Sequence, residues 1–190
     1  NSFSNDGTSF IDDIAKADGK DIRVADCSIG GCSLERHYGN IFNGTTDYSF
    51  YYRTITGTKS FSNVGMYQAL VATDWDYITI QQVSSDSPNY ETYEPYLTRV
   101  MDFVRECAPK AKILVHQTWA YESGCDRIKS FGFETYDEMF AKIKECYANA
   151  AKEINRNYTN SFEQTHIQIC DRYQELAKEL IDKANNFKIS

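Results

Sequence analysis

The stretch Asp76-Tyr-Ile-Thr-Ile-Gln-Gln82 decides the fold class of this chain. Its β-branched and mostly apolar residues predict a strand. A second such stretch, Lys112-Ile-Leu-Val-His-Gln117, follows a segment whose apolar residues recur at helical spacing over 93–107. Two strands joined through a helix indicate a parallel βαβ unit with a right-handed crossover. We therefore expect an α/β protein.

The same alternation of helix and strand continues on both sides of this unit. The other predicted helices span residues 8–17, 66–73, 133–154 and 162–187. The first of them carries Phe10, Ile11 and Ile14 on one face, which we expect to be buried. A further strand is predicted over 21–27, and the segment 37–62 is predicted to be a long loop with a short hairpin over 48–55.

The composition is that of a soluble globular protein and excludes some function classes. The 190 residues, 42% hydrophobic and 25% charged, predict one domain over 1–190 with a substantial core. The net charge of −7 argues against a nucleic-acid partner, because binding of that kind uses clustered Lys and Arg. No apolar run has the length of a membrane span, so no membrane partner is expected, and the compartment stays open.

The six cysteines show neither a CxxC pair nor a His/Cys metal spacing. We therefore expect no metal site. An even count permits disulfides without requiring them. The 14 Tyr and 11 Phe residues suit a pocket that stacks against sugars or other flat polar ligands, although a Tyr-rich core and surface is the better explanation for any single one of them.

Polar clusters follow each of the three predicted strands. They are Gly30-Gly-Cys-Ser33, Gln81-Gln-Val-Ser-Ser85 and His116-Gln-Thr-Trp119. In parallel sheets, ligands bind beyond the carboxyl ends of the strands. A fourth polar stretch, Asn1-Ser-Phe-Ser4, stands just before a helix start, where free backbone N–H groups favour negative charge. We expect all four to meet at one rim.

Five segments together resemble the SGNH (GDSL-like) hydrolases, and most closely a branch with Gly-Asn-Ser-Phe-Ser near its N-terminus. The matching segments are Asn1–Ser4, Ile29–Glu35, Trp75–Ser84, Tyr90–Leu97 and His116–Tyr121. They occur in unbroken order over roughly the first two-thirds of the chain. The resemblance implies a three-layer α/β/α sandwich with a mostly parallel, flavodoxin-like sheet, and ester hydrolysis through a serine nucleophile.

The resemblance also implies roles for single residues. Ser2 matches the nucleophile. Gly31, or else Gly30, matches the glycine whose backbone N–H forms the oxyanion hole together with that of Ser2. Gln82, with Gln81 as its rival, stands where the superfamily places a side-chain amide donor, usually Asn.

The last superfamily motif, Asp-x-x-His, has its nearest equivalent in Glu163-Gln-Thr-His166. By this match His166 is the general base and Glu163 orients it. Two departures accompany the match. The strand that the family places before Ser2 is not in the sequence, and the part of the chain from about residue 155 is atypical.

The resemblance suggests short acyl esters as substrates, with acetyl groups on carbohydrate as one example, and neither a metal nor an organic cofactor. His116, Trp119 and Tyr121 are expected to line the substrate pocket. A second hypothesis is a catalytically inactive carbohydrate-binding or interaction module on the same scaffold. A flavodoxin-like nucleotide binder is a third, but no phosphate-binding motif supports it.

Overall fold

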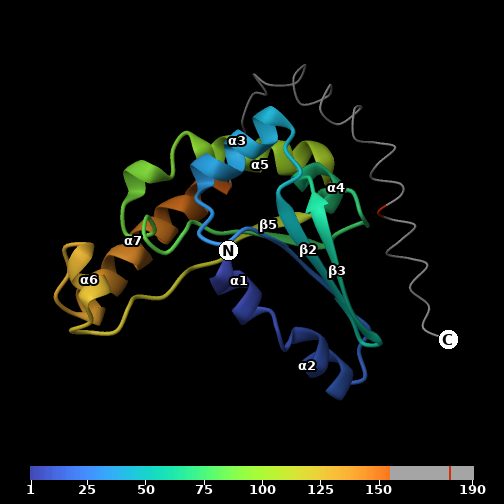
Figure 1. Cartoon of the computed structure of the whole chain (residues 1–190), viewed down its shortest axis with the longest axis horizontal. Coiled ribbons are helices and arrows are strands. Elements are labelled where there is room, and N and C mark those ends of the chain that lie inside the picture. The colour runs from blue at the N-terminus through green and yellow to red at the C-terminus, as the bar shows by residue number, and fades with distance from the viewer. Residues whose placement is uncertain (155–179, 181–190) are drawn as a thin grey trace.

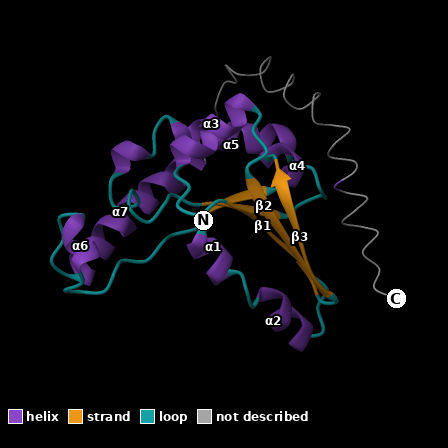
Figure 2. Cartoon of the chain, viewed as in Figure 1, coloured by secondary structure: helices purple, strands orange, loops and turns teal. Residues whose placement is uncertain are grey.

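The structure, a computed structural model, describes residues 1–154 and residue 180. It shows a mixed α/β protein with one antiparallel and one parallel sheet (Figure 2). The strands are β1 (Arg23–Ser28), β2 (Tyr48–Thr54), β3 (Gly57–Val64), β4 (Tyr77–Ile80) and β5 (Lys112–Val115). The helices are α1 (Ser2–Gly7), α2 (Ile11–Ala17), α3 (Leu34–Asn43), α4 (Met66–Leu70), α5 (Tyr96–Cys107), α6 (Asp126–Ser130) and α7 (Tyr136–Ile154), with a 3₁₀ turn at Tyr90–Thr92.

The predicted βαβ unit is confirmed. Strands β4 and β5 pair in parallel, from Tyr77 opposite Lys112 to Ile80 opposite Val115, and α5 connects them. The strand predicted over 21–27 differs from expectation, because β1 pairs antiparallel with β2, in a separate sheet. The β2–β3 hairpin is longer than predicted, and β1 pairs with its β2 strand. In the described residues only β4 and β5 are parallel, so they do not form the mostly parallel sheet that we expected.

The segment predicted as a long loop over 37–62 is mostly regular structure. It contains most of α3 and of the β2–β3 hairpin. Ser33 caps α3 by accepting a hydrogen bond from the N–H of Arg36, and Gly44 ends it in the left-handed conformation with φ of 60°. A serine at the start and a glycine just past the end are helix signals that the sequence does contain.

The apolar face predicted for the first helix is not buried. Helix α2 is shorter than predicted, and Phe10 and Ile14 are 68% and 67% exposed. The helix contacts β1 on one side, and no other described element covers Phe10 and Ile14. None of the described helices is long and apolar enough to cross a membrane.

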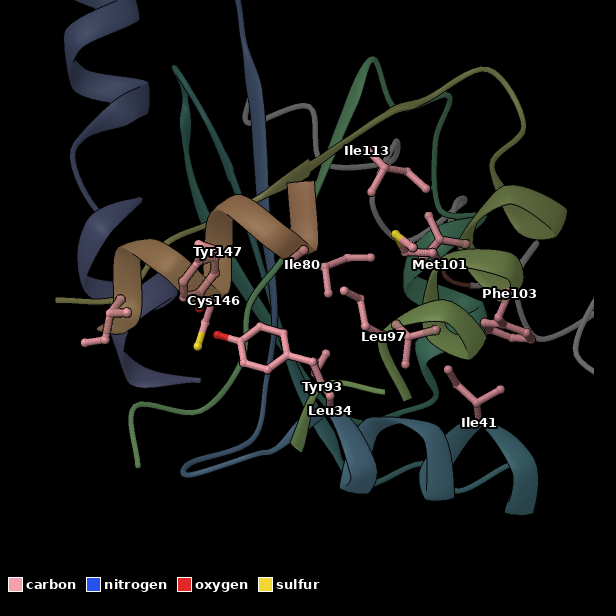
Figure 3. Close-up of a cluster of buried hydrophobic side chains, with 14 of the residues drawn as sticks. Leu34, Ile41, Ile80, Tyr93, Leu97, Met101, Phe103, Ile113, Cys146 and Tyr147 are labelled. Atoms are coloured by element: carbon pink, nitrogen blue, oxygen red, sulfur yellow. The ribbon is translucent and has the colours of Figure 1, made fainter. Parts of the chain in front are cut away.

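The main core lies between β4, β5 and the helices α3, α5 and α7 (Figure 3). Helix α5 contributes Leu97, Val100, Met101, Phe103 and Val104, all of which are 3% exposed or less. Burial of such side chains stabilises the fold by about 1.5–3 kcal/mol each. A second core joins β2, β3 and α4, and Leu180, within the helix predicted over 162–187, is buried in it.

Candidate functional site

Helix α1 begins at the end of β4. The side-chain oxygen of Asn1 caps the helix by accepting a hydrogen bond from the N–H of Phe3 at 3.1 Å. Its amide nitrogen donates to the backbone oxygen of Gln82 at 3.3 Å. Asn1 is 6% exposed, so both bonds are protected from water. Figure 1 shows the N-terminus in the middle of the molecule, beside the strands.

Gln82 joins this helix start to the start of α3. Its side-chain oxygen accepts hydrogen bonds from the N–H groups of Leu34, at 3.0 Å, and Val83, at 2.9 Å. Its amide nitrogen donates to the backbone and side-chain oxygens of Thr92. The residue is 1% exposed. The Gln82 amide therefore holds the site together, and an oxyanion would have to displace Thr92 to receive its N–H groups.

Ser4 joins the same helix to the ends of β4 and β5. Its hydroxyl oxygen lies 2.9 Å from Oε1 of Gln81 and 3.3 Å from Nδ1 of His116. The backbone N–H of His116 donates to the Ile80 carbonyl and so extends the β4–β5 ladder. Burial lowers the pKa of His116, which favours the neutral imidazole. A neutral imidazole has one N–H donor and one acceptor nitrogen, so the role of Nδ1 towards Ser4 depends on the tautomer.

The direction of these bonds follows from the Gln81 amide. Gln81 is 7% exposed, and its Nε2 has no partner in the described structure while Oε1 faces Ser4. The Ser4 hydroxyl donates its one proton to Oε1 of Gln81. Neutral His116, in the tautomer with the proton on Nδ1, therefore donates to Ser4 Oγ.

Aromatic side chains border the helix start. The rings of Phe3 and Trp119 lie 4.1 Å apart, and Trp119 is 42% exposed. The Tyr121 hydroxyl lies 2.6 Å from Oγ of Ser84, in the loop after β4, and its ring stacks on Phe131. Of the three predicted pocket residues, His116 and Trp119 thus contact α1, whereas Tyr121 contacts the β4 loop.

Ser2 is the first residue of α1 and is exposed. Within the described residues its hydroxyl makes no hydrogen bond. Gly31 is also exposed, has φ of +61°, and has open space where a Cβ would stand. Both Ser2 and Gly31 are therefore accessible to solvent. The predicted base His166 and its partner Glu163 lie outside the described residues.

The remaining described histidine, His37, and the thiols of Cys27 and Cys32 do not titrate near neutral pH. Nδ1 of His37 lies 2.8 Å from the Tyr48 hydroxyl, and burial lowers the pKa of His37 to about 3. The residue lies on α3 rather than in an exposed loop. Burial raises the pKa of the Cys27 thiol and that of Cys32, the latter to about 11. Neither thiol supplies a thiolate nucleophile near neutral pH.

The sequence prediction named Ser2 and Gln82 but gave no role to Ser4 and ranked Gln81 second. Ser4 is two residues from Ser2, and Gln81 ends the best-predicted strand, so both lay in the segments already singled out. What identifies them is the contact of Ser4 with Gln81 and with His116, the latter 112 positions away in the sequence.

The comparisons with known proteins give a family. Residues 1–170 match the model of a domain of unknown function, DUF4886. The chain belongs to the DUF4886 family. A crystal structure of a DUF4886 family protein from Bacteroides uniformis ATCC 8492 is similar, with a TM-score of 0.76 and 29% sequence identity. The similarity covers 83% of this chain, which spans 62% of that structure's chain. No curated protein matches.

Proposed function

We propose that this DUF4886 protein is a serine-dependent ester hydrolase of the SGNH type. The observation that carries the proposal is the contact of Ser4 with Gln81 and His116, which joins the first turn of α1 to the ends of β4 and β5. The Asn1–Gln82–Leu34 bonds add the start of α3 to the same rim. A serine-bearing helix start at the ends of parallel strands is the setting that hydrolysis of this type uses.

In the proposed reaction the Ser2 oxygen attacks the ester carbonyl carbon while an imidazole takes the serine proton. His166 is the base that the sequence resemblance assigns, with Glu163 orienting it. The backbone N–H groups of Ser2 and Gly31 bind the oxyanion. The imidazole returns the proton to the leaving alcohol as the C–O bond breaks. Water then cleaves the acyl-enzyme and restores the hydroxyl.

Of the two glutamines, Gln82 fits the role of side-chain amide donor less well, because its amide nitrogen already donates to Thr92. The Gln81 amide faces the α1 turn through Ser4 and has an unpartnered nitrogen. We infer that the side-chain amide donor to the oxyanion is one of these two glutamines. We also propose that the reaction needs neither a metal nor an organic cofactor.

We propose a carbohydrate ester as substrate and a single domain over 1–190. The exposed Trp119 beside α1 offers a flat surface for a sugar ring, and the acetyl group is the simplest acyl group. The parallel β4–β5 pair, with α5 between the strands, supports a three-layer α/β/α sandwich as the complete architecture.

The test is hydrolysis of p-nitrophenyl acetate and of acetylated oligosaccharides by the wild type and two serine variants. Ser2→Ala is expected to lower kcat at least about 10³-fold, because the nucleophile is lost. Ser130→Ala is the matched control, since Ser130 is exposed and bonds only within α6. Equal activity of Ser2→Ala and the wild type would contradict the proposal.

A second candidate is an inactive carbohydrate-binding module on the same scaffold. The observation that favours it is that the Ser2 hydroxyl has no imidazole partner within the described part of the chain. This candidate predicts saturable binding of oligosaccharides, lost in Trp119→Ala, with no turnover of either ester.

A further inference from the structure

Helix α1 is held in place almost without apolar burial. It has six residues, and none of them is buried. Isolated helices of this length are unstable in water, so tertiary contacts must fix it. The contacts that fix it include the hydrogen bonds of Asn1, Ser4 and Asn5 and the ring contact of Phe3 with Trp119. The position of Ser2 at the start of this helix therefore depends on hydrogen bonds.

These hydrogen bonds fall into three groups along the helix. Asn1 ties the start to Gln82. Ser4 ties the first turn to Gln81 and His116. Asn5 accepts a bond of 2.7 Å from Arg53, which also reaches Thr8 at the helix end. The Asn1 group adjoins Ser2 in sequence but reaches only the end of β4, whereas the Ser4 group, two residues from Ser2, reaches the ends of both parallel strands and so fixes the first turn against the βαβ unit.

We propose that Ser4, Gln81 and His116 are positioning residues, forming a clamp that fixes the first turn of α1 so that the Ser2 hydroxyl can react. This inference rests on the function proposed above. The clamp acts through Ser4, since Gln81 and His116 bond to Ser4 and, within the described residues, neither hydrogen-bonds to Ser2. The His116 ring also packs beside Gly7, where a Cβ would lie 3.4 Å from Cε1 of His116.

The donor and acceptor roles in the clamp are specific. The Ser4 hydroxyl donates to Oε1 of Gln81, and Nδ1–H of neutral His116 donates to Ser4 Oγ. An Asn side chain places a polar atom close to the position of Nδ1, so His116→Asn can keep the bond to Ser4, whereas His116→Ala cannot. An Asn cannot serve as a general base. The two variants therefore separate positioning from proton transfer.

A small displacement of the Ser2 turn has a large kinetic effect. A reacting group misplaced by about 1 Å costs about 10²-fold in rate. Loss of the clamp is thus expected to lower kcat on p-nitrophenyl acetate by about 10- to 100-fold and to leave KM within about threefold, because that ester has no sugar ring to bind beside Trp119.

The experiment measures kcat and KM on p-nitrophenyl acetate and the rate constant for labelling by a fluorophosphonate probe. The variants are Ser4→Ala, His116→Ala, His116→Asn, and Ser9→Ala as a control on the same segment, whose hydroxyl bonds only to Asp6. Ser4→Ala and His116→Ala should lose about 10- to 100-fold in kcat and in labelling rate, whereas His116→Asn and Ser9→Ala should stay near the wild type.

Three results would overturn the clamp. Wild-type kinetics in Ser4→Ala and His116→Ala, with Ser2 still labelled, would reduce the contact to a structural one. Equal losses in His116→Asn and His116→Ala would make His116 a base. Complete loss of labelling in Ser4→Ala with full labelling in Ser2→Ala would make Ser4 the nucleophile. A wild type that neither hydrolyses esters nor takes the label would instead overturn the proposed function, and this inference with it.

Discussion

The side-chain oxygen of Gln82 accepts the backbone N–H of Leu34 at 3.0 Å, although the two residues are 48 positions apart. The same carboxamide bonds to Val83 and Thr92, and the backbone oxygen of Gln82 receives the Asn1 amide. One buried residue thus fixes the starts of α1 and α3 relative to the end of β4.

Gln82→Leu keeps the volume of this side chain and removes its hydrogen bonds. We expect it to lower the free energy of unfolding by about 2–4 kcal/mol, because the N–H of Leu34 is left buried and unpaired. Gln117→Leu is the matched control, since Gln117 is exposed, and should stay within about 0.5 kcal/mol of the wild type. Urea unfolding measures both, and equal values for the two variants would contradict the structural role of Gln82.

The second prediction concerns pH. Burial lowers the pKa of His37 to about 3, below its ordinary value of 6.5, so the unfolded chain binds the proton more readily. Stability should therefore fall as the pH drops from about 6.5 towards 3, and this group alone accounts for about 1–2 kcal/mol at pH 5. His37→Asn, which does not titrate, can keep a bond to Tyr48.

Urea unfolding of the wild type and of His37→Asn at pH 7 and pH 5 measures this effect. The variant should lose less stability between the two pH values than the wild type does. Because other groups titrate in the same range, the comparison is between the two proteins and not between absolute values. An identical loss in both would exclude His37 as a source of acid sensitivity.

The third prediction tests the carbohydrate substrate. Trp119→Ala removes the exposed ring beside α1, so KM for an acetylated oligosaccharide should rise about 10-fold, as expected for a lost stacking contact of about 1.4 kcal/mol. The same variant should hydrolyse p-nitrophenyl acetate nearly as the wild type does, because that ester has no sugar ring. Tyr77→Ala, another exposed aromatic that lies on β4, serves as the control. A parallel loss on both esters would argue against sugar stacking.

Much of the fold could be predicted because its signals are local. Helix α5 and strands β4 and β5 follow from apolar spacing and from β-branched residues, which depend on neighbours in the sequence. Helix α3 was missed among Tyr, Asn and Gly residues, although Ser33 and Gly44 mark its ends. The antiparallel pairing of β1 with β2 was not predictable in this way, since the sequence of one strand does not specify which strand it pairs with.

The candidate site, too, could be predicted from the sequence only in part. The convergence of the first four residues with the strand ends follows from the geometry of parallel strands, and the bonds of Asn1 and Ser4 agree with it. The sequence suggested Gln82 as a donor to the oxyanion, but in the structure its amide nitrogen already donates to Thr92 and its oxygen accepts from Leu34. Such tertiary partners cannot be read from the residue itself. Glu163 and His166 remain predictions.

The most direct test of the proposed reaction is to locate the covalent adduct. The wild-type protein is treated with a fluorophosphonate, digested, and mapped by mass spectrometry. The proposal predicts one adduct, on Ser2, that is absent after denaturation before treatment and absent in Ser2→Ala. An unmodified Ser2 in the folded protein, or an adduct only on another residue, would contradict it.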